Sequence, residues 1–442
     1  MKKIKVLCLM SVLLLSFVTA TGCSGSQSPS SGNTGSSEDG QPDEGVSTIS
    51  VMMLGTASDN YAKIYQEITD DFNASNSLNC KAELQLYENE QYKTKLTTLM
   101  ASNSVPDVFF SWELGYLQPF VEGGKVLEIG PELDKDPEWK ERYAEGVFGP
   151  VTFHDKIYGV PCAKSLSVMF YNKEIFNENQ LEVPQTYEDF LNICEQLKQK
   201  RIIPMTLSAV DAWIPAQFIQ QLAMGMGAFP DYEALLAGDG RWDTPAFTNA
   251  GLEAQSLIDK GYFQDGFLGM SAEEAAKLFQ EGKAAMYFQG TWDLGTLANP
   301  ELTQKADVIG AFGMPAKDPS NDNYYVGSIN TILCASSSTK NVEAVCEYIK
   351  SYSTTESQEK LLYGVGFLPS TNLQIDEEKI NSLTADVVKI SGQAKGFSAW
   401  MDRAFGAGDG VEFNNKCQAI FGGNDPEQEF KSLQQYAEDN AD

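Results

Sequence analysis

Hydrophobic and polar residues alternate along the chain with the two periods that distinguish strands from helices. Residues 48–53 form a short β-branched and apolar run, which a small-polar stretch at 55–60 follows. Apolar side chains then recur at helical spacing in Tyr61, Ile64, Tyr65, Ile68 and Phe72. Residues 80–87 and 105–110 repeat the strand pattern on either side of another helical segment. This β-α-β-α-β order predicts a parallel sheet.

The same two periods continue through the rest of the chain. Thr186 begins a second helical pattern, in which Asp189 is placed for a capping box, and Asn341 begins a third. Strand-like runs lie between them at 202–207, 284–288 and 329–334. No internal repeat of fixed period is present. We therefore predict an α/β fold, whose ligands lie at the carboxyl ends of the strands.

The first 22 residues predict an export signal. Lys2, Lys3 and Lys5 precede an uncharged apolar run at 6–18, and small residues follow as far as Gly22. This run is shorter than the roughly 20 residues that a membrane-spanning helix needs. We interpret residues 1–22 as a cleaved signal peptide.

Ala20-Thr21-Gly22-Cys23 resembles the lipobox of bacterial lipoproteins, although Leu is more usual where Ala20 stands. The resemblance implies that Cys23 becomes the first mature residue and carries lipid, and a stray signal-region cysteine is the alternative. Residues 24–47 are mostly Ser, Gly, Pro and acidic residues, a composition typical of a flexible tether. We therefore expect an exported protein on the outer face of the bacterial cytoplasmic membrane, held there by its lipid alone.

Charge and residue usage exclude several kinds of partner and chemistry. The net charge of −29 argues against nucleic acid and anionic lipid as partners. His154, the single histidine, argues against His metal sites and Ser-His or Cys-His catalysis, and we interpret it as part of a hairpin turn. We expect no metal and no cofactor. Six cysteines without zinc-ligand spacing follow Cys23, and we interpret them as small core residues: Cys80, Cys162, Cys194, Cys334, Cys346 and Cys417.

Five short segments give a more specific indication. They are PDVFF at 106–110, YGVP at 158–161 followed by YNK at 171–173, PQTYEDF at 184–190, FQEGKAAM at 279–286 followed by GTW at 290–292, and GFLPS at 366–370. In this order they resemble the family 1 extracellular solute-binding proteins, the maltose-binding-protein-like subunits of carbohydrate ABC importers. The resemblance extends over nearly the whole body of the chain.

The resemblance implies a two-lobed, periplasmic-binding-protein-like type II clamp. The body after residue 47 exceeds the usual domain size of about 100 to 200 residues, which also favours two lobes. A monomer would capture a mono- or oligosaccharide between the lobes and deliver it to membrane permease subunits, without catalysis. The implied boundaries are 48–163 plus 327–364 for the N-lobe and 164–326 plus 365–442 for the C-lobe, with three hinge crossings near 162–165, 326–329 and 365–368.

A sugar ring has hydroxyls around its rim and apolar C–H faces, so its site needs aromatic platforms beside carboxylates, amides or cations. The resemblance places Trp292 and Trp400 where the family has tryptophans that stack on sugar, and Asp293 follows the first of them. Asp402 and Arg403 follow the second and are positioned to hold hydroxyls. A surface ion pair is the alternative for these two residues.

Two more aromatic and acidic pairs follow predicted strands. We interpret Trp112 as a platform and Glu113 as a hydroxyl acceptor, and a lobe-core aromatic is the alternative for Trp112. Asp211 and Trp213 match a pair of the family's C-lobe, with helix-start packing as their alternative. Further candidates chosen by position are Ser58, Asp59, Asn60, Glu88, Asn89, Lys164, Ser165, Asn330 and Phe367. For Asp59 a helix cap is the alternative.

Two other functions fit parts of the pattern. The same clamp would serve a phosphorylated polyol or a peptide, although basic residues are sparse in the candidate loops. Carboxylates beside tryptophans also occur as the catalytic pair of a secreted glycoside hydrolase. Binding of a carbohydrate remains the main expectation.

Overall fold

The structure is a computed structural model, and it describes residues 46–57, 59–144 and 146–441. The predicted signal peptide, the lipobox with Cys23 and residues 24–45 of the predicted tether lie outside the described residues, and so does Ser58. Within the described part, no helix is both long and apolar enough to cross a membrane.

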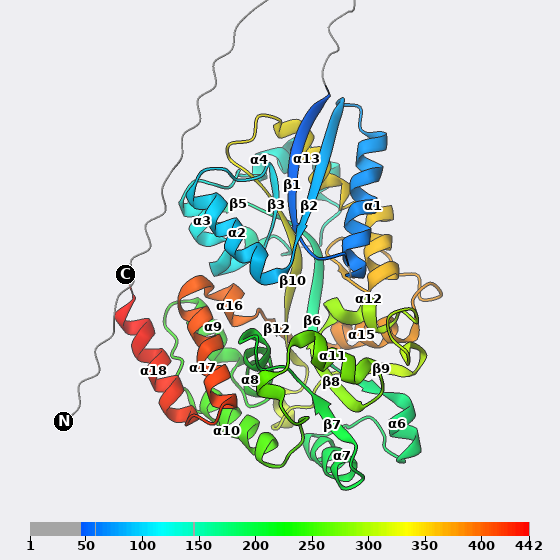
Figure 1. The fold of residues 1–442 in the computed structure, drawn as a ribbon. Helices are drawn as coiled ribbons and strands as arrows, with labels where there is room; N and C mark the ends of the chain where they lie inside the picture. The colour runs from blue at the N-terminus through cyan, green and yellow to red at the C-terminus, as the bar shows by residue number, and fades with distance from the viewer. Residues whose placement is uncertain (1–45, 58, 145, 442) are drawn as a thin grey trace, which may run out of the picture. The chain divides into compact units, whose positions relative to one another are not determined.

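One ten-stranded sheet runs through the described body, in the order β2-β1-β3-β10-β6-β8-β7, with β11 and β9 paired to β6 and β12 paired to β10 (Figure 1). A separate hairpin consists of β4 and β5. The strands are β1 (Ser47–Leu54), β2 (Cys80–Tyr87), β3 (Val108–Ser111), β4 (Thr152–Phe153), β5 (Lys156–Ile157), β6 (Val160–Asn172), β7 (Ile203–Thr206), β8 (Ala284–Gly290), β9 (Ile309–Phe312), β10 (Tyr324–Ala335), β11 (Leu368–Pro369) and β12 (Gly396–Ser398).

The first three strands confirm the predicted parallel order. β1 pairs in parallel with β2 over its whole length and with β3 at Val51 and Met52. Because the strands are parallel, their carboxyl ends meet at one edge of the sheet, where loops carry the side chains that reach a ligand. β2 ends there at Tyr87, opposite Leu54 of β1.

Helices cover the sheet and fill the remainder of the body. Thr186 caps α7 as predicted: its Oγ1 accepts from the Asp189 amide, and the Asp189 carboxylate accepts from the Thr186 amide. Asn341 precedes α13 but its side chain makes no capping hydrogen bond. The helices are α1 (Asn60–Ser75), α2 (Asn89–Ala101), α3 (Gln118–Glu122), α4 (Gly130–Lys135), α5 (Pro137–Lys140), α6 (Lys173–Glu178), α7 (Tyr187–Gln199), α8 (Trp213–Met224), α9 (Phe229–Leu236), α10 (Pro245–Asp259), α11 (Ala272–Gln280), α12 (Leu294–Leu297), α13 (Val342–Ser351), α14 (Thr355–Glu359), α15 (Ser382–Gln393), α16 (Met401–Ala404), α17 (Val411–Phe421) and α18 (Pro426–Asp439).

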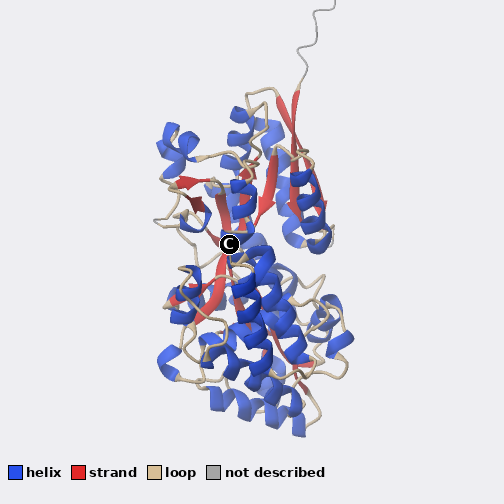
Figure 2. Ribbon diagram, turned by 90° about the vertical axis from the view of Figure 1, so that its left-hand side faces the viewer, coloured by secondary structure: helices blue, strands red, loops and turns tan. Residues whose placement is uncertain are grey.

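The two longest strands, β6 and β10, run from the region of β1–β3 into the region of β7–β9 (Figure 1). The first half of β6 pairs with β10, and its second half pairs with β8 and β9. A view turned by 90° shows strands, in red, among the helices in both the upper and the lower part of the body (Figure 2). The two regions therefore share continuous backbone.

Buried apolar side chains form three clusters. The first lies around β1–β3 with α1, α2 and α13, and the second lies around α8, α10, α17 and α18. The third packs α15 against β6, β8 and β9. Met169 belongs to the second cluster and Phe170 to the third, because neighbouring side chains of a strand point to opposite faces.

Two local predictions are confirmed. His154 and Asp155 join β4 to β5, and both have positive φ, 51° and 63°, as a two-residue hairpin turn of type I′ requires. The six cysteines after Cys23 are all buried and free. Burial raises the pKa of these thiols wherever a change is resolved, as at Cys162 and Cys417, so they remain protonated.

Candidate ligand-binding site

Three tryptophans from distant parts of the sequence meet in one cluster, which we call the tryptophan cluster. The ring centroids of Trp292 and Trp400 are 5.3 Å apart, and those of Trp213 and Trp292 are 5.8 Å apart. Trp400 is buried, whereas Trp213 and Trp292 are partly buried. Half of the six tryptophans of the chain thus gather at one place. Such an assembly offers apolar ring faces to a ligand.

The position of Trp292 depends on the residues before it. A Cβ atom on Gly290 would lie 2.3 Å from the Trp292 ring, so only glycine allows the indole to lie over the backbone here. Thr291 Oγ1 lies 2.7 Å from Ser165 Oγ and accepts from the Leu166 amide at 3.2 Å. These contacts join the 3-10 turn of Thr291–Asp293 to β6, and they engage Ser165, one of the predicted ligand contacts.

Arg403 supports the tryptophan cluster from one side. Its guanidinium carbon lies 4.0 Å from the Trp400 ring centroid and 5.7 Å from that of Trp292, and its Nη1 donates to the Ile329 carbonyl at 3.3 Å. Burial lowers the pKa of Arg403, and the nearby carboxylates of Glu113 and Asp402 oppose this change. The surface ion pair considered for Asp402 and Arg403 is wrong, because the guanidinium is stacked on aromatic rings and forms no ion pair within the described chain.

Glu113 is fully buried, and neither of its carboxylate oxygens forms a hydrogen bond of normal geometry among the described residues, although the Ser328 hydroxyl lies close enough to favour the ionised carboxylate. Burial raises the pKa of this carboxyl group, while the Arg403 guanidinium favours its ionised form. Glu113 is the second residue after β3, and the turn that follows it is close to α16: a Cβ atom on Gly115 would lie 2.6 Å from the Ala404 carbonyl oxygen. A buried acceptor without a donor is costly, so this carboxylate is ready to accept from a ligand hydroxyl.

Trp112 lies apart from the tryptophan cluster. It is 4% exposed and packs edge-on against Phe110 and Tyr116, with ring centroids 4.9 and 4.7 Å away. Lys93 Nζ lies 5.5 Å from its ring centroid. This environment favours the lobe-core alternative, and a ligand contact for Trp112 remains a prediction.

The loop after β1 lies against the turn that contains Asp293. Asn60 Nδ2 donates to the Gly295 carbonyl at 2.9 Å, and Asp293 Oδ2 accepts from the Tyr287 hydroxyl at 2.9 Å. Burial raises the pKa of Asp293 to about 6, and the nearby Asp59 carboxylate adds to this rise. Asp59 stands at the N-cap position of α1, but the capping interpretation is wrong, because its Oδ2 accepts from the Thr56 amide at 2.7 Å and from the Thr56 hydroxyl instead.

Asp211 faces the start of α2. Burial and the carboxylates of Glu90 and Glu88 raise the pKa of Asp211, and Lys93 opposes them. Glu88 itself is exposed and caps α2, since its Oε2 accepts from the Glu90 amide at 3.0 Å and the Gln91 amide at 3.2 Å. The helix-start alternative fits both members of the pair: the Asp211 carbonyl accepts from the Ile214 amide at 3.0 Å, and Trp213 is the first residue of α8, although the Asp211 side chain forms no cap. A ligand contact for Asp211 and Trp213 remains a prediction. The next predicted contact, Asn89, donates to the Glu90 carboxylate at 3.2 Å.

The last three candidates lie where β6, β10 and β11 meet. Lys164 is exposed and lies opposite Ile329 of β10 and Leu368 of β11. The register of β10 shifts around Asn330, a β-bulge of the kind that redirects a side chain beside a site. Phe367 is 1% exposed and stacks on Tyr61 at 5.6 Å, so it contributes to the first core cluster.

Comparison with known proteins identifies the family. The model for the bacterial extracellular solute-binding protein family matches residues 56–359. The chain belongs to this family. It is therefore a solute-binding protein and not a glycoside hydrolase.

Relatives of this solute-binding protein agree with the fold and the family. The multiple sugar-binding protein of Streptococcus mutans is 23% identical over 350 residues, covering 78% of this chain and 80% of that one. The arabinooligosaccharide-binding protein of Bacillus subtilis is 24% identical over 379 residues, covering 84% and 81%. A solved structure from work on xylan utilization by the thermophilic bacterium Caldanaerobius polysaccharolyticus is 28% identical, with a TM-score of 0.82 over 88% of this chain and 99% of that one. The chain has the mixed α/β fold of periplasmic binding proteins.

A buried polar network that the sequence pattern did not predict adjoins the tryptophan cluster of this solute-binding protein. Gln217 Oε1 accepts from Trp400 Nε1 at 3.3 Å, and Gln217 Nε2 donates to Gln289 Oε1 at 2.8 Å. Gln289 Nε2 in turn donates to the Tyr287 hydroxyl at 3.1 Å, and that hydroxyl donates to Asp293. Glutamines within the apolar α8 were the available signal, because a buried amide requires partners.

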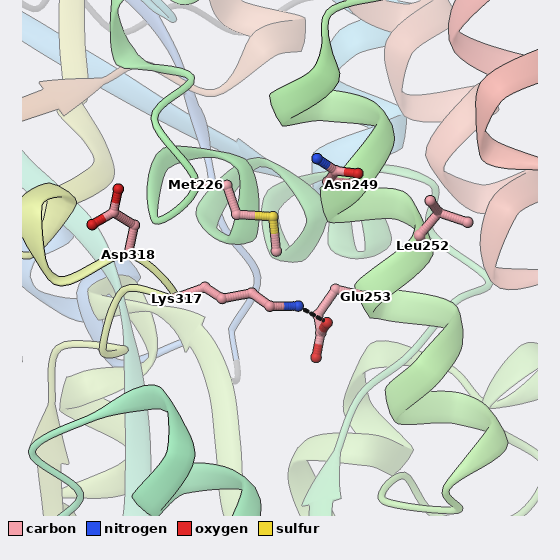
Figure 3. A pocket seen from close by; sticks show the side chains of 6 residues that line it. All are labelled: Met226, Asn249, Leu252, Glu253, Lys317 and Asp318. Atoms are coloured by element: carbon pink, nitrogen blue, oxygen red, sulfur yellow. Dashed lines mark hydrogen bonds and ion pairs between the residues drawn. The ribbon is translucent and has the colours of Figure 1, made fainter.

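A pocket of about 340 Å³ lies elsewhere, between α10 and the loops after α8 and β9 (Figure 3). Across it Lys317 forms an ion pair with Glu253, whose other oxygen accepts from the Tyr187 hydroxyl at 3.0 Å. It shares no residue with the tryptophan cluster, and its lysine is already paired with Glu253. Its lining residues are Met226, Asn249, Leu252, Glu253, Lys317 and Asp318.

Proposed function

We propose that this solute-binding protein captures a carbohydrate, most simply an oligosaccharide, at the tryptophan cluster and delivers it to the permease of an ABC importer. The observation that carries the proposal is the cluster itself, with the buried carboxylate of Glu113 and the guanidinium of Arg403 beside it. Aromatic faces receive the apolar faces of sugar rings, and buried charged groups exchange hydrogen bonds with hydroxyls.

The named relatives support the same cargo. Sugars and oligosaccharides are what the multiple sugar-binding protein and the arabinooligosaccharide-binding protein are named for. A phosphorylated cargo receives less support, because the charged groups around the cluster are mainly acidic: Asp59, Glu113, Asp211, Asp293 and Asp402.

The proposal includes two lobes that close on the sugar. In its support, buried residues pass from one core cluster to another between Ala163 and Leu166 and between Tyr325 and Ile329. Near the third predicted crossing the two clusters alternate, and Leu362 and Leu368 belong to the third cluster. The first two changes coincide with the predicted boundaries, while Val365 and Phe367 pack with the first cluster, a few residues beyond the predicted third boundary. The sugar would stabilise the closed form because it binds that form more tightly than the open form, and the size of the shift is set by the difference between the two affinities.

We also propose attachment to the outer face of the cytoplasmic membrane through lipid on Cys23. The lipobox-like Ala20-Thr21-Gly22-Cys23 and the tether composition that follows support it. Metabolic labelling with a palmitate analogue should label the wild-type chain and not Cys23→Ser, and labelling of both would contradict the anchor.

A panel of solutes tests the cargo. The purified chain is heated with mono- and oligosaccharides, and in parallel with phosphorylated polyols and short peptides. We expect a rise in melting temperature with at least one sugar, since a ligand that binds only the folded state stabilises it. Stabilisation by another solute class and by no sugar would overturn the proposal.

Substitution within the cluster tests the place of binding. Trp292→Ala should weaken the affinity for the stabilising sugar by about 2 kcal/mol or more, as expected for a buried aromatic anchor. Trp292→Phe retains a platform and should lose less. Isothermal titration measures both, and a loss of under about 0.5 kcal/mol in Trp292→Ala would place the sugar elsewhere.

A further inference from the structure

Trp400 and Asp293 are the two ends of one continuous run of hydrogen bonds. The Trp400 indole Nε1 donates to Gln217 Oε1 at 3.3 Å, and Gln217 Nε2 donates to Gln289 Oε1 at 2.8 Å. Gln289 Nε2 donates to the Tyr287 hydroxyl at 3.1 Å, and that hydroxyl donates to Asp293 Oδ2 at 2.9 Å. We call these five residues the amide relay.

The direction of every hydrogen bond in the amide relay is set by groups that can only donate. An indole N–H has no acceptor, so Gln217 must turn its oxygen to Trp400 and its amino group to Gln289. The Gln289 oxygen also accepts from the Gly290 amide at 2.9 Å, a second group that only donates. Gln289 therefore presents its amino group to Tyr287, whose own hydrogen is left for the carboxylate at the end of the relay. All four bonds point from the indole to the carboxylate.

The middle of the amide relay is closed to water. Gln217 is 1% exposed, and Gln289 and Tyr287 are each 3% exposed. In such an interior, hydrogen bonds that point the same way polarise one another, so a change at one end of the run is felt at the other. Water cannot replace a missing member, and the loss of one member leaves its neighbours without a partner.

The amide relay also determines how the Trp400 indole is turned within its own plane. The Arg403 guanidinium carbon lies 4.0 Å from the Trp400 ring centroid, and the Trp292 centroid lies 5.3 Å away. These contacts act mainly on the plane of the ring, whereas the bond from Nε1 to Gln217 has one direction within that plane. Ser167 Oγ donates to the same Gln217 oxygen at 3.1 Å and ties it to β6. Gln217 thus fixes which edge of the indole faces outward.

Building on the proposed function, we propose that Gln217 is a positioning residue of the carbohydrate site, which holds the Trp400 indole and Asp293 in one arrangement through the amide relay. Gln217 is buried and acts through these two residues, without contact to the sugar. A surface whose groups are already in place binds more tightly, because less ordering is needed when the sugar arrives.

The first test follows the Trp400 indole without any sugar. Its N–H gives one ¹⁵N resonance, which Trp400→Phe identifies. Tyr287→Phe removes only the hydroxyl within the relay, and Tyr287 makes no ring or hydrogen-bond contact with Trp400 among the described residues. We expect the Trp400 resonance to shift in Tyr287→Phe. Tyr187→Phe is the matched control, because the Tyr187 hydroxyl also donates to a buried carboxylate, Glu253 at 3.0 Å, and this variant should leave the resonance in place.

The second test measures affinity by calorimetry. Xylo-, chito- and arabino-oligosaccharides of two to six units are titrated into the wild-type chain, and the tightest-binding one into Gln217→Met, Tyr287→Phe and the double variant. Each single change should weaken binding about fivefold, as for one hydrogen bond lost from a buried network. The double variant should lose about tenfold at most, whereas independent effects would multiply to about 25-fold.

Gln434→Met is the matched control for the loss of a buried amide. Gln434 accepts from the Trp242 amide and donates to Glu438, both at 2.8 Å, and it belongs to α18. This variant should leave the affinity within twofold of the wild-type value. A general loosening of the fold would weaken binding in Gln434→Met as well.

Each outcome bears on one proposal. An unshifted Trp400 resonance in Tyr287→Phe, or losses that multiply in the double variant, would overturn the positioning role while sugar capture stands. Tyr287→Phe removes one oxygen, so it keeps the test decisive if Gln217→Met does not fold. A wild-type chain that binds none of these oligosaccharides would overturn the proposed function, and the positioning role with it, whatever the resonance shows.

Discussion

Gly290 illustrates how one residue without a side chain positions another that has a large one. The Trp292 indole lies over Gly290, where an added Cβ atom would approach its ring to 2.3 Å. Gly392 in α15 is different, because an added Cβ atom there meets nothing within 4 Å.

Alanine at these two glycines should have opposite effects. Gly290→Ala should displace the indole, lower the free energy of unfolding by about 1 to 3 kcal/mol, and change the tryptophan fluorescence. Gly392→Ala should raise the free energy of unfolding by up to about 1 kcal/mol, since it replaces glycine inside a helix. Urea denaturation measures both, and an unchanged stability and fluorescence in Gly290→Ala would contradict the described contact.

Asp293 should make the stability of the chain depend on pH. Its pKa is about 6 in the folded chain and 3.8 ordinarily, chiefly because burial disfavours the ionised form. Between these values the folded chain binds more protons than the unfolded chain, so the contribution of Asp293 to the free energy of unfolding falls as the pH rises through this window. The loss is complete above about pH 6.

Asp293→Asn removes that loss and retains an acceptor for Tyr287. The free energy of unfolding of the variant, relative to that of the wild-type chain, should therefore rise between pH 4 and pH 7. The expected rise is up to about 3 kcal/mol, because each unit of pKa change corresponds to about 1.4 kcal/mol. Chemical denaturation at both pH values measures the difference. Asp59, Tyr61 and Tyr287 face the same carboxyl group, and none of them changes in the variant. A difference that is the same at pH 4 and pH 7 would contradict the assignment.

At the scale of elements, the local signals were predictable and the distant contacts were not. The capping box of Thr186 and Asp189 and the turn at His154 depend on neighbours in sequence, and the structure confirms both. The meeting of Trp213 with Trp292 depends on how strands are ordered in the sheet, which the pattern of either segment does not contain. A residue at a strand end, such as Trp112, has the same sequence signal whether it lies in the core or in a site.

The caps of two helices give a matched test of a local signal. Thr186→Ala removes a hydroxyl that accepts from the Asp189 amide at 3.1 Å, so it should lower the free energy of unfolding by about 1 kcal/mol. Asn341→Ala at the start of α13 should cost less, because the Asn341 side chain makes no capping hydrogen bond. Thermal or urea denaturation compares them, and equal costs would mean that the capping bond contributes nothing.

At the scale of the whole molecule, charge should select the cargo. The chain has a net charge of −29, and the groups that influence the candidate site include Asp59, Glu90, Asp211 and Asp293 on two sides. Arg403 is already stacked on Trp400, so part of its positive charge interacts with that ring and is less available to an anionic ligand. An anionic ligand approaching this site would be repelled both by the net field and by the nearest carboxylates.

We therefore predict discrimination against sugars that carry uronic acids. A uronate-substituted oligosaccharide should bind at least tenfold more weakly than its neutral counterpart of equal length at low salt. The difference in affinity between the two sugars should become smaller as salt increases. Screening shortens the range of charge–charge repulsion to about 10 Å at 0.1 M. Asp211→Asn should also reduce this difference in affinity at low salt. The affinity for the neutral sugar should change less than the affinity for the charged one. Calorimetric titration at two ionic strengths measures all three effects, and equal binding of the charged and neutral sugars at low salt would mean that shape, not charge, decides what this site admits.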